Sequence, residues 1–117
     1  MHYFNKLEVW QKARTLCKQI YVITRAFPSY EKYGLASQMR RSVISISSNI
    51  AEGAGRNTKN DFIHFLNIST GSAFELETQI YVSKDLEYIT EEKESELIAE
   101  IQSIQKMLYR LIQSINK

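Results

Sequence analysis

Apolar residues recur every three or four positions along most of the chain, the spacing that places side chains on one face of an α-helix. The first such stretch predicts a helix over residues 7–26. Its apolar stripe comprises Val9, Trp10, Ala13, Leu16, Ile20, Ile23 and Phe27. Pro28 lacks the N–H group that would extend this helix, so the residues around it are predicted to form a connection.

The same periodicity predicts a second helix over residues 35–52. Its apolar face comprises Leu35, Met39, Val43, Ile46 and Ile50. The helix is expected to end at the pair Gly53 and Gly55, because glycine readily adopts the left-handed conformation that closes many helices.

Two further helices are predicted over residues 59–87 and 91–115. The third begins after Thr58, whose hydroxyl can accept a hydrogen bond from the first turn of the helix, and Thr90 starts the fourth. The third stripe comprises Phe62, Leu66, Ser69, Ala73, Leu76 and Ile80. The fourth comprises Leu97, Ile101, Ile104, Leu108, Leu111 and Ile115.

No stretch alternates apolar and polar residues for long enough to form a strand. Four long helices with short connections predict an all-α protein, an antiparallel up-down four-helix bundle. The repeat of 3.5 residues favours left-handed crossings of about 20°. The whole chain, residues 1–117, is expected to form this single domain.

Composition excludes several classes of protein. With 44% hydrophobic and 24% charged residues in 117, the chain is neither disordered nor a disulfide scaffold. Cys17 is the only cysteine, so it forms no intrachain disulfide. Neither a signal-type apolar run nor 18 consecutive apolar residues occur. A cytoplasmic protein without membrane contact is therefore expected.

The net charge of +2 is unevenly distributed. Residues 1–60 contain ten Lys and Arg against three acidic residues, a net +7, and residues 61–117 contain five against ten, a net −5. This asymmetry is typical of a basic binding face, and equally of two halves that attract each other within a bundle.

Basic residues near aromatic ones suggest candidate contacts with nucleic acid. Arg14, Lys18, Tyr21 and Arg25 follow helical spacing on the first helix. Arg56 and Lys59 flank the N-terminus of the third helix, a favourable position for anions. The alternative is that both groups form ordinary solvated surface.

Two further patterns suggest packing between helices or between subunits. Arg40 and Arg41 begin rows on the second helix, and we hypothesise that they pair with Glu52, Glu75 and Glu77 to fix helix register. Several aromatic residues lie off the stripes, which suggests a second apolar seam for self-association, unless these residues simply lie at the surface. They are Tyr21, Phe74, Tyr81, Tyr88 and Tyr109.

No catalytic or metal-binding pattern is found. His64 lacks the second ligand motif that a metal site in a bundle needs, and Cys17 has no histidine at helical spacing. We therefore expect no catalytic residues, no metal, no cofactor, no small-molecule substrate and no enzyme activity.

Two segments have residue patterns specific enough to compare with known protein families. Residues 27–56 read FPSYEKYGLASQMRRSVISISSNIAEGAGR, and residues 71–77 read GSAFELE. Together they resemble the four-helix-bundle family named for 23S rRNA intervening sequences. The residues that match the central motif are Arg40, Arg41, Asn49, Glu52, Gly53 and Arg56. Those that match the second motif are Gly71, Ser72, Glu75 and Glu77.

The resemblance implies a small up-down bundle that tends to form cyclic homo-oligomers, often five-fold. A related group acts as the accessory protein of diversity-generating retroelements and binds a reverse transcriptase and nucleic acid. The matched motif residues are interpreted mainly as packing and register residues. Two functions remain: a homo-oligomeric adaptor that binds RNA or a nucleoprotein, or a protein-interaction scaffold without nucleic-acid contact.

Overall fold

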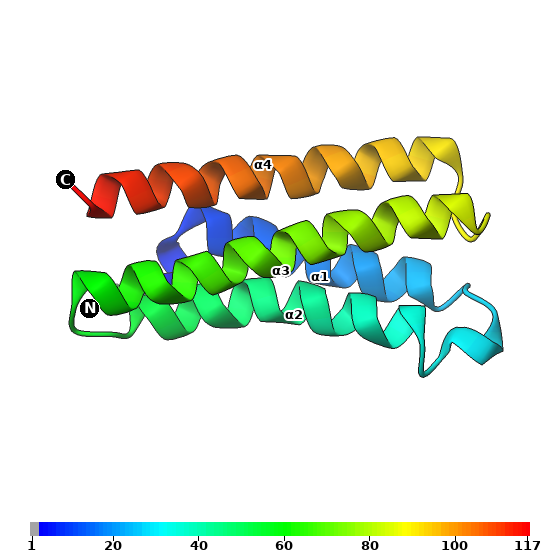
Figure 1. Cartoon of the computed structure of the whole chain (residues 1–117), viewed down its shortest axis with the longest axis horizontal. Helices are drawn as coiled ribbons and strands as arrows, with labels where there is room; N and C mark the ends of the chain where they lie inside the picture. The colour runs from blue at the N-terminus through cyan, green and yellow to red at the C-terminus, as the bar shows by residue number, and fades with distance from the viewer. Residues whose placement is uncertain (1–2) are drawn as a thin grey trace.

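The computed structural model describes residues 3–117 and is built from four α-helices. They are α1 (Glu8–Thr24), α2 (Leu35–Ala54), α3 (Lys59–Asp85) and α4 (Glu91–Ile115), with short 3-10 turns at Phe4–Lys6 and Ser29–Glu31. Successive helices run in opposite directions along a body of 44 × 24 × 20 Å (Figure 1). The prediction of an all-α, antiparallel up-down bundle is confirmed.

The helix ends follow local chemistry. The hydroxyl oxygens of Thr58 and Thr90 each accept a 3.1 Å hydrogen bond from the backbone N–H three residues later, which the sequence predicts for Thr58. α1 ends at Thr24, two residues before the expected position, and α2 continues to Ala54.

The expected left-handed glycine cap of α2 is wrong. Gly55 has a φ of −82°, and Gly53 lies buried within the helix. A Cβ atom on Gly53 would lie 2.9 Å from the Cβ of Phe65 on α3. Gly53 is therefore required by the close approach of two helices rather than by a turn.

The core is formed by the four apolar stripes. Their central members are buried, and Leu66, Ile80 and Ile104 have no exposed surface. Stripe residues at the helix ends, such as Ile23, Leu111 and Ile115, are only partly buried. The periodicity therefore identified the core and overestimated burial at its ends, because terminal turns have fewer helices beside them.

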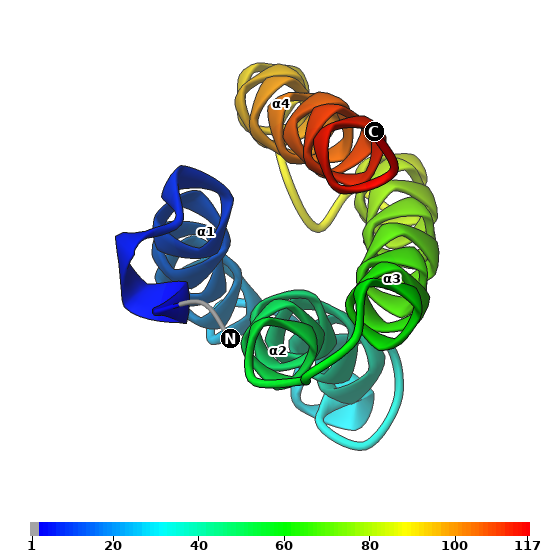
Figure 2. The ribbon, with the colours of Figure 1, turned by 90° about the vertical axis from the view of Figure 1, so that its left-hand side faces the viewer.

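The helices lie in chain order around the core, and α1 and α4 face each other across its most open side (Figure 2). α2 and α3 pack most extensively, because Ser45, Ser69, Ser72 and Gly53 keep their facing sides small. Ser45 and Ser72 share a 2.8 Å hydrogen bond, and the hydroxyl of Ser69 donates to the carbonyl of Ile46.

The two connections at one end of the bundle are joined. Glu31 accepts a 3.0 Å hydrogen bond from the N–H of Leu35 at the start of α2 and a 2.7 Å bond from the hydroxyl of Tyr88. The ring of Tyr88 packs 5.0 Å from the ring of Phe27. Tyr88, which the sequence placed off the stripes, therefore fastens the turn after α3 to the turn before α2.

Candidate functional site

Three cations form an exposed row on the outer side of α1. Arg14, Lys18 and Arg25 are all exposed, and their spacing of four and seven residues puts them on one face. Between residues 3 and 117 the ion pairs are Arg56–Glu52 and Lys93–Glu96, so the row has no carboxylate partner. The guanidinium of Arg14 lies 5.6 Å from the centre of the Trp10 ring. We call these three residues the α1 cation row.

Tyr21 shares this side of α1 and is covered by Arg40. The Arg40 guanidinium lies 4.7 Å from the centre of the Tyr21 ring. Its Nε donates a 2.9 Å hydrogen bond to the hydroxyl of Thr24, and a terminal nitrogen lies 3.4 Å from the Tyr21 carbonyl. Arg40 thus places positive charge at the C-terminus of α1, where the helix dipole favours it. The Arg40 guanidinium therefore already occupies one face of the Tyr21 ring.

A basic hollow of about 430 Å³ adjoins the row. It is lined by Tyr21, Lys32, Tyr33, Ser37, Arg40, Arg41 and Ile44. Tyr33 is 88% exposed, and the Lys32 ammonium lies 5.5 Å from the centre of its ring. The sequence did not predict Lys32 and Tyr33 as site residues, although they are adjacent within the segment FPSYEKYG. Helical spacing gives no information about side chains in a connection between helices.

The other two candidate cations lie at the opposite end of α2. Arg56 pairs with Glu52 at 2.7 Å and stacks 4.8 Å from the centre of the Phe65 ring. The ammonium of Lys59 lies 3.5 Å from the carbonyl of Lys117. Ala54, at this end of α2, follows Ile44 of the basic hollow by ten residues, so about 15 Å of helix separates them. The six candidates therefore do not form one site.

The hypothesised network of Arg40 and Arg41 with three glutamates is wrong. Arg40 binds Thr24 and Tyr21, Arg41 is exposed, and Glu52 pairs with Arg56. The side chain of Glu77 instead accepts a 2.7 Å bond from Gln105 and a 3.3 Å bond from Gln102, both on α4. Helix register is thus fixed by amides and hydroxyls.

The remaining motif residues divide into packing and surface positions. Asn49 donates to the carbonyl and hydroxyl oxygens of Ser45, which in turn bonds to Ser72. Gly71 and Glu75 lie at the surface, and a Cβ on Gly71 would meet no atom within 4 Å. Close packing of α2 against α3 explains why the motif contains Asn49, Ser72 and Gly53. Packing within one chain does not explain Gly71 and Glu75.

Three exposed aromatic side chains lie on the side of α3 and α4. Phe74, Tyr81 and Tyr109 are 55%, 43% and 65% exposed. The Glu77–Gln105 bond sets the antiparallel register, so residues just before Glu77 lie beside residues just after Gln105. Phe74 and Tyr109 are therefore neighbours across the α3–α4 seam. We call Phe74, Tyr81 and Tyr109 the aromatic face.

Nothing in residues 3–117 brings together three His, Cys, Asp or Glu side chains that could hold a metal. Burial raises the pKa of the Cys17 thiol above its ordinary value, although a hydrogen bond with Ser47 opposes the shift. A thiol with a raised pKa is a weak nucleophile at neutral pH. None of the helices described is long and apolar enough to cross a membrane.

Comparison with known proteins agrees with this geometry. The family model of the 23S rRNA-intervening sequence protein matches residues 5–110. The chain belongs to this family. A crystal structure from Bacteroides thetaiotaomicron, a protein of unknown function from the S23 ribosomal protein family, superposes with a TM-score of 0.83 at 28% identity. That similarity covers 89% of this chain and 97% of the other. No curated protein matches significantly.

Membership in the 23S rRNA-intervening sequence family accounts for the bundle and for the motif residues that pack α2 against α3. The family match includes the α1 cation row, the basic hollow and the aromatic face, since all three lie within residues 5–110.

Proposed function

We propose that this chain is a non-catalytic, homo-oligomeric bundle that binds RNA through the α1 cation row. The observation that carries the proposal is that Arg14, Lys18 and Arg25 are exposed on one face without a carboxylate partner. Cations that neutralise phosphates release the counterions condensed on the nucleic acid, which is a main source of affinity.

The test is the salt dependence of binding to a labelled RNA hairpin, followed by fluorescence anisotropy. If the three cations of the row neutralise about three phosphates, log affinity falls against log salt with a slope of about −3. The double variant Arg14→Ala/Arg25→Ala should weaken binding and make the slope shallower by about 2. The matched control, Lys106→Ala/Arg110→Ala, removes two exposed cations from α4 and should leave the slope nearly unchanged.

Two results contradict RNA binding through this row. The first is no binding of structured RNA at low salt. The second is an equal loss of RNA affinity in the α1 and α4 double variants, which would show that binding does not depend on the α1 cation row.

We also propose self-association, which the aromatic face favours. Phe74, Tyr81 and Tyr109 are each more than 40% exposed, and aromatic residues are enriched at protein interfaces. They lie on the half of the chain with a net charge of −5, whereas the basic hollow, with exposed Ile44, lies on the half with +7. The halves of the chain that carry the two surfaces are thus opposite in net charge. Contact between the aromatic face of one copy and the basic hollow of the next is a head-to-tail interface, which forms a ring where the rotation between copies closes.

Light scattering of the purified protein tests this second proposal. A five-fold ring has five times the chain mass of 13.6 kDa. Phe74→Glu/Tyr109→Glu should give monomers, and Tyr3→Glu, at an aromatic residue that is 83% exposed outside both surfaces, should not. A wild-type monomer at micromolar concentration would exclude the ring.

A further inference from the structure

The segment from Val9 to Ala51, which forms α1 and most of α2, is strongly basic. It contains seven Lys and Arg residues and a single acidic residue, Glu31. The carboxylate of Glu31 accepts hydrogen bonds of 3.0 Å from the Leu35 N–H and 2.7 Å from the Tyr88 hydroxyl, so it is engaged within the turns. Both ion pairs of residues 3–117 lie outside this segment. Its positive charge is therefore left uncompensated within the chain.

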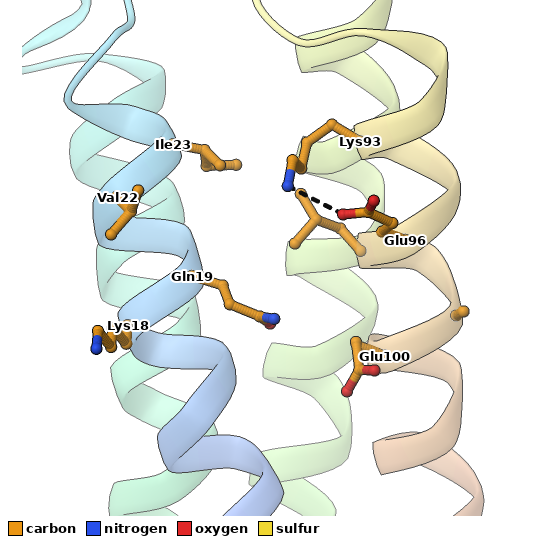
Figure 3. A pocket seen from close by; sticks show the side chains of 9 residues that line it. Lys18, Gln19, Val22, Ile23, Lys93, Glu96 and Glu100 are labelled. Carbon is orange, nitrogen blue, oxygen red and sulfur yellow. Dashed lines mark hydrogen bonds and ion pairs between the residues drawn. The ribbon is translucent and has the colours of Figure 1, made fainter.

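The cations of α1 lie on the outer side of the bundle. Figure 3 shows Ile23 and Gln19 directed towards α4, where they line a groove of about 500 Å³, whereas Lys18 is directed away from α4. Tyr21 follows Lys18 by three residues and precedes Arg25 by four, so the three side chains share one face of α1. Tyr21 also lines the basic hollow. The α1 cation row and the basic hollow therefore meet at Tyr21.

The basic hollow combines positive charge with an open aromatic ring. Its cations are Lys32, Arg40 and Arg41, and none of the residues that line it is acidic. Arg41 is exposed and takes part in neither ion pair of residues 3–117. The ring of Tyr33 is 88% exposed, with the Lys32 ammonium 5.5 Å from its centre, so at least one ring face is open. These groups suit a ligand that joins a flat ring to a negative charge.

We propose that the basic hollow binds an unpaired nucleotide of the RNA, which rests on the RNA binding proposed above. The base stacks on the open face of the Tyr33 ring, because every base has a flat π face that aromatic side chains accept. Lys32 and Arg41 neutralise the phosphates beside that base. The volume of the hollow, about 430 Å³, lies within the range of sites that bind small organic molecules.

A paired nucleotide does not meet these requirements. In an A-form duplex the bases stack on one another, so they offer no free face to Tyr33, whereas loops, bulges and ends offer unstacked bases. Arg14, Lys18 and Arg25 instead contact phosphates, which a duplex also presents. The α1 cation row therefore binds the backbone of a duplex, and the hollow selects RNA in which an unpaired nucleotide adjoins that duplex.

The contact between copies proposed above uses the same hollow. An aromatic ring of a second chain and a base would then compete for one space. The variant Phe74→Glu/Tyr109→Glu removes the aromatic face and leaves every residue of the hollow unchanged. The binding experiment is therefore carried out with the wild type and with this variant.

Three RNA probes that share one duplex test the proposal. The first has blunt ends, the second has a short unpaired extension, and the third has an extension of the same length without bases. The second and third probes carry the same phosphates, so a difference in affinity between them comes from the bases. In fluorescence anisotropy, we expect the extension with bases to bind at least about fivefold more tightly than the abasic one, the gain from one stacked base.

Matched protein variants locate the stacked base. Tyr33→Leu removes the ring and should abolish the advantage of the extension with bases, whereas Tyr33→Phe keeps the ring and should retain it. Tyr30→Leu is the control, because Tyr30 belongs to the same connection, is 76% exposed and does not line the hollow. Lys32→Gln/Arg41→Gln removes charge, so it should weaken both extended probes equally and make the salt slope shallower by about 2. Circular dichroism checks that each variant is folded.

Three results overturn the nucleotide site. They are equal affinities for the extended and abasic probes, an advantage that Tyr33→Leu leaves intact, and equal losses in Tyr33→Leu and Tyr30→Leu. A Tyr33→Leu effect that disappears in the Phe74→Glu/Tyr109→Glu background would assign Tyr33 to the contact between copies and also overturn it.

The blunt duplex separates this proposal from RNA binding through the α1 cation row. Duplex binding that depends on Arg14 and Arg25, with equal affinities for the extended and abasic probes, would keep the row and remove the nucleotide site. Binding of the extended probe alone, lost in Tyr33→Leu and unaffected by Arg14→Ala/Arg25→Ala, would keep the nucleotide site and remove the row.

Discussion

The carboxylate of Glu31 accepts a 2.7 Å hydrogen bond from Tyr88 and, through its other oxygen, a 3.0 Å bond from the N–H of Leu35. One side chain thus satisfies an otherwise unpaired donor at the start of α2 and holds the turn between α3 and α4. These segments are 57 residues apart in the chain, so the contact is a tertiary one.

Tyr88→Phe is expected to lower the melting temperature. Phenylalanine retains the ring that packs against Phe27 and removes only the hydroxyl that donates to Glu31. Thermal unfolding followed by circular dichroism measures the effect. Tyr33→Phe, at a ring that is 88% exposed, is the control and should leave the melting temperature unchanged. Equal melting temperatures for wild type and Tyr88→Phe would show that the bond adds no stability.

Stability should fall in acid through Glu31. The hydrogen bond from the Leu35 N–H, and then the bond from Tyr88, hold the pKa of Glu31 below its ordinary value of 4.5. Because the folded-state pKa is lowered, the contribution is complete above about 4.5 and is lost as the pH falls through the folded-state value. Glu31→Gln should therefore flatten the dependence of melting temperature on pH below this range. An unchanged slope would contradict the assignment.

Two glycines should respond to alanine with opposite signs. Gly53→Ala places a Cβ 2.9 Å from the Cβ of Phe65 and is expected to cost about 1–3 kcal/mol in free energy of unfolding. Gly71→Ala meets no atom within 4 Å on an exposed turn of α3, so it should stabilise the chain by about 0.5–1 kcal/mol. Urea unfolding of monomeric protein measures both. Destabilisation by Gly71→Ala would contradict the open surroundings of Gly71.

Two adjacent arginines should behave differently. Arg40→Ala removes the hydrogen bond to Thr24 and the stacking on Tyr21, so it is expected to cost about 1–2 kcal/mol. Arg41 is exposed, and Arg41→Ala should change stability by less than about 0.5 kcal/mol. Arg41→Ala should instead weaken the proposed contact between copies, measured by sedimentation. A large stability loss in Arg41→Ala would mean that Arg41 has a structural role.

The fold could be predicted almost completely from the sequence. Helical spacing is a local property, so residues such as Leu66, Ile80 and Ile104 were identified as core before any packing was known. Thr58 was identified as a cap for the same reason, since its hydroxyl bonds only three residues along the chain.

The candidate sites were predicted less well. The exposed cations of α1 follow from helical spacing. The basic hollow does not, because Lys32 and Tyr33 belong to a connection whose course depends on the helices that it joins. Opposite charges on neighbouring helices suggested glutamate partners for Arg40, but the docking of α1 on α2 places Arg40 beside the free end of α1.

Four amphipathic helices, their buried faces and the separation of charge between the two halves of the chain all follow from the residue pattern. Helix docking is needed to explain that Gly53 serves close packing, that Glu31 joins two turns and that α1 and α4 leave a groove between them. The physical reason is how far apart along the chain the interacting residues lie. Helix formation depends on residues three or four positions apart, whereas these contacts depend on how complete helices dock through their side chains.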